Sequence, residues 1–119
     1  MTPETLLTAA LSASAPLSAL VAARIYSGAF PEKTPYPGIV YSRAGTEFIS
    51  TIHGSLIAED ADFSVQAWAA TRTAANAVAD AAVSALVGAG YVPSSRGDIA
   101  DDETGLEGVE IKVTILRNY

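Results

Sequence analysis

A strand that runs directly into an alanine-rich helix, between Asp62 and Gly90, constrains this fold more than any other stretch of the sequence. Side chains 63–68 alternate between apolar and largely polar positions, with the period of two that is typical of a strand. One face of this strand carries Phe63, Val65 and Ala67, and the other face carries Ser64, Gln66 and Trp68. A strand followed at once by a helix predicts that the helix packs back on the sheet.

The helix is predicted from a change of period after Thr71. Its apolar stripe has the i, i+3, i+4, i+7 and i+11 spacing of one helix face, and consists of Ala75, Val78, Ala79, Ala82 and Leu86. Thr71 is suited to cap the helix, and Gly88 or Gly90 is suited to end it. Because most of the stripe is alanine, we expect this helix to lie close to the sheet.

The first third of the chain predicts two helices and a short strand. Thr2-Pro3-Glu4 begins a helix, since threonine caps, proline suits the first turn and an acid faces the positive end of the dipole. A second, short helix carries Leu17, Leu20 and Val21. A brief strand at 24–26 then leads into an irregular connection, residues 27–37, that contains three prolines.

A hairpin of two longer strands is predicted next. The strands are Gly38 to Arg43 and Ser55 or Leu56 to Ala69, with a two-residue turn at His53-Gly54. This turn pairs residues whose numbers sum to 107, so that one face carries Ile39, Tyr41, Arg43, Ser64, Gln66 and Trp68. A bulge near Gly45 would shift the register by one residue and exchange the faces. In the simple register, an aromatic patch lies on a face that no helix covers.

The remaining segments predict a polar loop between two further strands. Tyr91-Val92 begins a strand, residues 93–108 form an acid-rich loop, and Glu110 to Leu116 closes the domain with clean alternation. The expected architecture is therefore one α+β domain spanning residues 1–119. It has a mainly antiparallel sheet of about four strands with helices packed on one face.

Composition excludes several classes of function. The chain has no cysteine, so disulfides, thiolate metal sites and a cysteine nucleophile are impossible. Its net charge of −6 argues against electrostatic binding to DNA or to an anionic membrane. No apolar run reaches the length of a membrane-spanning helix, and an N-terminal region with Glu4 and no basic residue argues against a signal peptide.

Candidate chemistry is weak. The single histidine, His53, can be drawn into a triad with nearby serines and Asp60, but no nucleophile elbow is present. An acidic cluster contains Asp98, Asp101, Asp102, Glu103, Glu107 and Glu110. Its spacing does not match a calcium-binding loop, so we expect a solvated loop, with a cation site or a source of negative potential for a pore or docking surface as alternatives.

Several short motifs resemble those of the tail completion or tail terminator proteins of long-tailed bacteriophages and gene transfer agents. They are Arg24-Ile25-Tyr26, Tyr36-Pro37-Gly38-Ile39-Val40-Tyr41, the strand Phe63 to Ala69, Thr71 with the helix Ala74 to Leu86, and Glu103-Thr104-Gly105-Leu106. The resemblance covers nearly the whole chain. It implies a structural, non-enzymatic virion protein that has no catalytic residue, no metal and no cofactor, and that is made in the host cytoplasm.

The same resemblance implies a ring, usually of six copies, on the head-proximal end of the tail tube. The ring stops tube growth and joins the tail to the head connector, and DNA passes through it without specific binding. A head-to-tail interface would cover the predicted aromatic face and bring the arm from Glu47 to Ala58 onto a neighbour. The residues expected at this interface are Ile39, Tyr41, Arg43, Gln66, Trp68 and His53, and those expected at the lumen or a docking surface are Asp98, Asp101, Asp102 and Glu103.

Two alternatives stay open at the level of the sequence. A head completion or neck protein would also form rings from a small α+β domain. A ligand-binding or metal-binding domain would instead use the acid-rich loop and His53.

Overall fold

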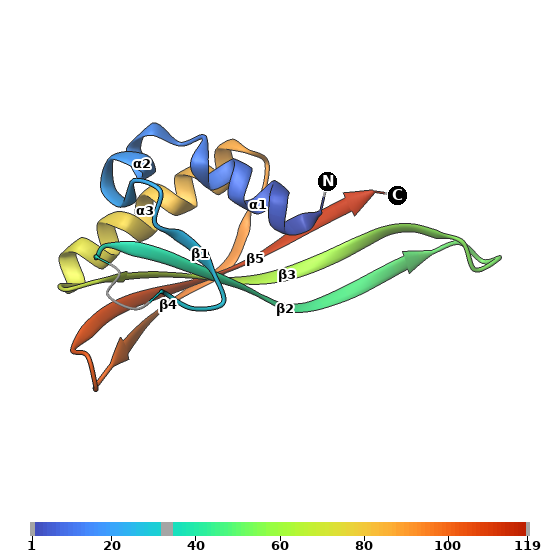
Figure 1. Cartoon of the computed structure of the whole chain (residues 1–119). Coiled ribbons are helices and arrows are strands. Elements are labelled where there is room, and N and C mark those ends of the chain that lie inside the picture. Colours follow the sequence, from blue (N-terminus) through green and yellow to red (C-terminus); the bar gives the residue numbers. More distant parts are fainter. Residues whose placement is uncertain (1, 32–34, 119) are drawn as a thin grey trace.

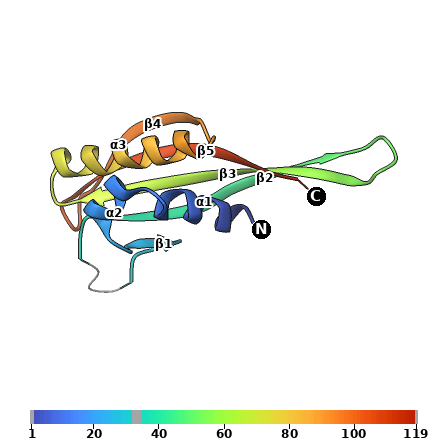
Figure 2. The ribbon, with the colours of Figure 1, turned by 90° about the horizontal axis from the view of Figure 1, so that it is seen from above.

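A computed structural model describes residues 2–31 and 35–118 as three helices and five strands (Figure 1). In chain order they are α1 (Pro3–Ser12), α2 (Ala15–Val21), β1 (Ile25–Ser27), β2 (Gly38–Ser50), β3 (Leu56–Ala69), α3 (Arg72–Gly88), β4 (Pro93–Asp101) and β5 (Leu106–Asn118). The strands form one sheet in the order β1-β2-β3-β5-β4, antiparallel except for the β1–β2 pair. All three helices lie on one face of this sheet (Figures 1 and 2).

The predicted fold class is confirmed, but the sheet has five strands instead of about four. The strand expected to begin at Tyr91-Val92 is misplaced: those two residues are not in a strand, and β4 occupies Pro93–Asp101, where the sequence predicts a loop. It is an edge strand paired only with β5, and most of its side chains are exposed on both faces. An exposed edge strand does not need alternating hydrophobicity, so the usual sequence signal is absent.

Helix ends follow the capping residues that the sequence places there. The side-chain oxygens of Thr2 and Thr71 accept hydrogen bonds from the N–H groups of Thr5 and Ala74, so both predicted caps are confirmed. At the end of α3, Gly90 has a φ of +92°, which glycine adopts without steric cost. The chain then closes a Schellman motif, in which the Tyr91 N–H donates to the Leu86 carbonyl at 2.8 Å.

The core lies between α3 and the middle of the sheet. The buried residues of α3 are the five of the predicted stripe: Ala75, Val78, Ala79, Ala82 and Leu86. They face the buried positions of β3 and β5, including Phe63, Val65, Ile111 and Val113. Leu7 and Leu11 of α1 and Leu17 and Val21 of α2 complete this cluster. The alternation predicted for β3 and β5 is therefore confirmed.

The register predicted for the β2–β3 hairpin is wrong near the body of the domain. Ile39 pairs with Ala67, Tyr41 with Val65 and Arg43 with Phe63, one residue away from the predicted partners. The register shift lies between Arg43 and Gly45, where the sequence places a bulge as the alternative. Ile39 and Tyr41 therefore point toward the helices, and Val40 takes the opposite face with Gln66 and Trp68.

The hairpin turn also differs from the predicted two-residue turn. The Thr51 N–H donates to the Ser55 carbonyl at 2.8 Å, which encloses a loop of three residues, Ile52, His53 and Gly54. The Gly54 N–H donates to the Thr51 carbonyl at 3.0 Å, and Gly54 has a φ of +86°. This is the three-residue hairpin that ends on a left-handed glycine.

Within the described residues, no single helix is both long and apolar enough to cross a membrane, and only α1 and α2 together, bent by 88°, pass that test by length and composition.

Candidate assembly surfaces

The β2–β3 hairpin extends beyond the rest of the sheet as an arm (Figures 1 and 2). β1 stops pairing with β2 at Tyr41, β4 stops pairing with β5 at Val113, and β5 stops pairing with β3 at Ala58. Residues 50–56 are therefore held only by the hairpin itself. The domain measures 52 × 29 × 24 Å, and its elongation reflects this arm.

Large apolar side chains gather at the end of the arm and are exposed. Ten large apolar residues of the described chain are exposed, and five of them lie within residues 48–57: Phe48, Ile49, Ile52, Leu56 and Ile57. Ile52, at the turn, is 96% exposed, and Phe48 is 59% exposed. Residues 48–58 include no Asp, Glu, Lys or Arg. We call residues 48–58 the arm tip. The clustering distinguishes the tip from scattered surface hydrophobics, which need no partner.

The base of the arm is fixed to the domain by two ion pairs. Glu59, which is only 4% exposed, pairs with Arg117 of β5 at 3.3 Å. Arg43 of β2 forms hydrogen bonds to both carboxylate oxygens of Glu4 at the start of α1. The guanidinium of Arg43 also lies 5.6 Å from the centre of the Phe63 ring. These contacts hold the base of the arm in one direction relative to the body.

The helix-free face of the sheet carries Trp68 near the end opposite the arm. The indole lies against Gly108 of β5, where an added Cβ would come within 2.8 Å of the ring. The same Cβ would come within 2.9 Å of Ile99 of β4, so the two side chains meet over this glycine. The indole N–H donates to the side-chain oxygen of Gln66 at 3.1 Å. These contacts fix the orientation of the partly exposed Trp68.

A pocket of about 230 Å³ lies beside Trp68 on this face, and we call it the outer pocket. Its apolar lining comes from Phe30 and Tyr36 of the β1–β2 connection, Val40, Trp68 and Leu106. Phe30 makes edge-to-face contacts with the rings of Tyr26 and Tyr36, at 5.8 and 5.1 Å. The connection thus supplies part of the cover for this face, which the sequence left open. Asp101, the last residue of β4, and Thr104, from the β4–β5 turn, line its edge.

The predicted acidic cluster is divided by the fold. Arg72, at the start of α3, pairs with Glu107 at 2.5 Å and lies 3.4 Å from Asp98. Glu110 accepts a hydrogen bond from Ser64 at 3.0 Å on the helix-free face. Asp101 accepts from the N–H of Glu103 at 3.0 Å, which shapes the turn. Asp102 and Glu103 remain exposed at the turn, and no group of three metal-ligating side chains forms among the described residues.

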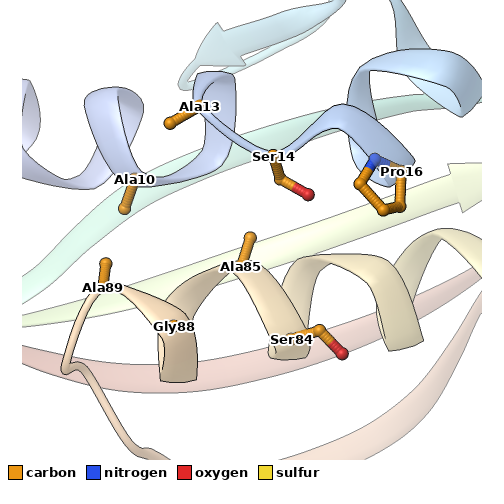
Figure 3. Close-up of a pocket in the computed structure, with 8 residues that line it drawn as sticks. All are labelled: Ala10, Ala13, Ser14, Pro16, Ser84, Ala85, Gly88 and Ala89. Atoms are coloured by element: carbon orange, nitrogen blue, oxygen red, sulfur yellow. The ribbon is translucent and has the colours of Figure 1, made fainter.

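A groove of about 440 Å³ lies between the helices, but it offers no reactive group (Figure 3). Figure 3 shows that small side chains of α1 and of the α1–α2 junction face those of α3 across it. Its only side-chain polar groups are the hydroxyls of Ser14 and Ser84, and that of Ser14 caps α2 by accepting from the Leu17 N–H at 3.3 Å. This groove contains no acid, base or nucleophile suited to catalysis.

The six residues predicted for an interface do not share one surface. Ile39 is fully buried beneath the helices, and Tyr41 packs against the core beside Phe63. Arg43 is engaged with Glu4, whereas Gln66 and Trp68 lie on the helix-free face. His53 is exposed at the end of the arm. The sequence predicts that the arm from Glu47 to Ala58 reaches a neighbour, but of the arm residues only His53 is among the six. The apolar pairs Phe48-Ile49 and Leu56-Ile57, which flank the turn, are the sequence signal for its exposed apolar residues.

Comparison with known proteins agrees with this arrangement of arm, sheet and helices. The family model for tail completion protein gp17 matches residues 5–117. No curated protein matches the chain. Among solved structures, a chain from the virion of a native gene transfer agent particle superposes with a TM-score of 0.74. The two share 22% identity, over 98% of this chain and 95% of that one, so this similarity shows a common fold. The matched family model spans nearly every element described above, and the chain belongs to the tail completion protein gp17 family.

Proposed function

We propose that this protein is a structural component of a phage tail or gene transfer agent particle. In this proposal it forms a ring, of six copies, on the head-proximal end of the tail tube and joins the tail to the head connector. It is made in the cytoplasm of the bacterial host and works by assembly, without a catalytic step. Membership of the tail completion family and the fold shared with a gene transfer agent chain support this function.

The exposed arm tip is the observation that carries the proposal. A large apolar side chain covers about 150–200 Å² when it is fully buried, so the exposed parts of the five tip residues amount to roughly 500 Å². The five side chains lie on both faces of the hairpin end, and this concentration of exposed apolar surface at one end of a small protein marks an interaction surface. The arm projects from the body and therefore cannot cover these side chains with its own domain. A partner must cover them.

A second copy of the chain is the partner that a ring requires. When one surface of a subunit contacts a different surface of the next, repetition of the contact gives a closed ring if the rotation closes. The net charge of −6 per subunit suits a channel that DNA crosses without adhering, because like charges repel. The exposed acids of the β4–β5 turn, Asp102 and Glu103, add to this potential if the turn faces the lumen or a docking partner.

Replacing an apolar tip residue tests the proposal. Phe48→Ser removes a side chain that is 59% exposed, and Val92→Ser is a matched control because Val92 is 75% exposed but lies outside the arm. We expect light scattering to give the mass of a ring for the unsubstituted protein and for Val92→Ser, and a smaller mass for Phe48→Ser. Electron micrographs of the unsubstituted protein mixed with tail tubes should show capped tube ends. A ring of unchanged mass in Phe48→Ser would remove the arm from the interface.

A further inference from the structure

We propose that the arm tip of one subunit occupies the outer pocket of the next subunit. This inference rests on the proposed ring and names the two surfaces that form its repeating contact. The two surfaces lie at opposite ends of β3, since Leu56 begins the strand at the tip and Trp68 lies at its far end. Twelve residues of strand span about 40 Å. The arm therefore cannot reach its own pocket, and the contact is intermolecular and head-to-tail.

The outer pocket has the chemistry of an interface centre. Trp68, Tyr36 and Phe30 provide aromatic walls, and Val40 and Leu106 provide aliphatic ones. Tryptophan and tyrosine are enriched among the residues that dominate binding energy at protein interfaces. Trp68 is already held by Gln66, Gly108 and Ile99, so little conformational freedom is lost when a partner packs against it. Ile52, which is nearly fully exposed at the turn, is the side chain best placed to enter.

Charge favours this pairing over contact between other surfaces. The chain carries a net charge of −6, but the arm tip has no carboxylate and carries the only histidine, His53. The edge of the pocket carries Asp101, the last residue of β4, and Asp102 and Glu103 follow it in the β4–β5 turn. An imidazole N–H donates a hydrogen bond to a carboxylate in either protonation state of the ring. The uncharged tip can therefore approach the acidic edge of the pocket on another copy, whereas the rest of the acidic subunit surface would be repelled by that edge.

The groove between the helices is the competing receptor for the tip. It is lined by Ala10, Ala13, Ala85, Gly88 and other small residues, and it has neither an aromatic wall nor a charged edge (Figure 3). It would accept an isoleucine but would leave His53 without a carboxylate to accept a hydrogen bond from the imidazole N–H. The roughly 500 Å² of apolar tip surface would supply more than half of the area of about 800 Å² that each partner buries in a stable interface. The strands that support the tip would supply the remaining area of the interface.

Cysteine cross-linking distinguishes the two receptors, because the chain contains no cysteine of its own. We would mix Ile52→Cys with Thr104→Cys, which lies at the edge of the outer pocket, and oxidise the full-length proteins under ring-forming conditions. Parallel mixtures pair Ile52→Cys with Ala85→Cys in the helical groove, and with Ser95→Cys on β4 away from both. A disulfide requires α-carbons within about 7 Å, so each mixture reports one geometry.

We expect a covalent dimer with Thr104→Cys at least tenfold more abundant than with Ala85→Cys or Ser95→Cys. The double variant Ile52→Cys/Thr104→Cys should give a ladder of covalent species that ends at the size of the ring. A ring by light scattering that cross-links only through Ala85→Cys would overturn the choice of pocket but leave the proposed function intact. A protein that stays monomeric at every concentration, with no cross-link in any mixture, would contradict the ring as well.

A carboxylate introduced at the tip provides a second, independent measurement. His53→Asp places an acid against the acidic edge, and we expect self-association to weaken at least tenfold. Adding Asp102→Lys in the same chain should restore association to within threefold of the unsubstituted protein. Because both residues are exposed, neither change should alter the unfolding transition. Equal self-association of His53→Asp and the unsubstituted protein would refute the charge pairing.

Discussion

Replacing Ala79 with leucine tests whether α3 depends on small side chains to lie against the sheet. Ala79 is fully buried in the stripe that faces β3 and β5. Leucine adds three carbon atoms where the packed interior has no room for them. Overpacking of a core costs about 1–3 kcal/mol, and we take about 2 kcal/mol as the expected loss. Ala77→Leu is the matched control, because Ala77 is exposed on the same helix and both substitutions change helix propensity equally.

The expected loss is readily measured. The unfolding entropy of a 119-residue domain is about 0.25 kcal/mol per kelvin, so a loss of 2 kcal/mol lowers Tm by about 8 °C. Ala77→Leu should stay within about 0.5 kcal/mol of the unsubstituted protein. Urea unfolding followed by far-UV circular dichroism and by Trp68 fluorescence gives the free energy of unfolding of each variant, and thermal unfolding gives its Tm. All proteins are compared at one fixed concentration, because assembly raises apparent stability. Equal stability of the two variants would refute the idea that α3 is seated closely on the sheet.

Two further substitutions test the contacts at the start of α3. Arg72→Met removes hydrogen bonds to the carbonyls of Gly108 and Ile99 and the ion pair with Glu107, so we expect a loss of about 2 kcal/mol after allowing for the one-third exposure of the side chain. A larger increase in amide exchange, relative to the unsubstituted protein, in β4 than in β3 would locate the effect at the edge of the sheet. A loss of stability under about 0.5 kcal/mol would contradict the prediction. Thr71→Ala should cost about 1 kcal/mol through the lost cap in urea unfolding, and an unchanged midpoint would show that the cap contributes nothing.

Sequence periodicity was sufficient to predict the layer of helices and the two central strands. The five-residue stripe of α3 and its capping residue Thr71 were correct, because each sequence-local signal agrees with the tertiary packing. The alternation of β3 and β5 was also correct, since these strands lie in the middle of the sheet with one face buried. Burial on one face is the physical condition that makes period-two patterns informative.

The edge of the sheet and the register could not be predicted from the same signals. β4 is exposed on both faces, so its sequence carries no burial pattern and was predicted as a loop. The β2–β3 register depends on irregularities after Arg43 and after Ile49, and a shift of one residue moved Ile39 and Tyr41 to the core face. The predicted interface therefore combined residues that lie on different surfaces. The arm itself is predicted to reach a neighbour, but the exposure of Phe48, Ile52 and Leu56 is not, because apolar residues next to a turn have the same sequence signal as buried strand residues.

The last prediction concerns Gly108, because the position of Trp68 and therefore the shape of the outer pocket depend on it. In Gly108→Ala the new Cβ would lie 2.8 Å from the indole and 2.9 Å from Ile99, and β5 is paired on both sides at this residue. The side chains must move apart, and we expect a loss of about 1–3 kcal/mol, a shifted Trp68 emission maximum and weaker ring formation. Gly97→Ala is the control, since its Cβ would meet no atom within 4 Å. If sedimentation, fluorescence and urea unfolding cannot separate the two variants, the indole does not need the bare backbone of Gly108, and the pocket does not have the rigid wall on which docking of the arm tip depends.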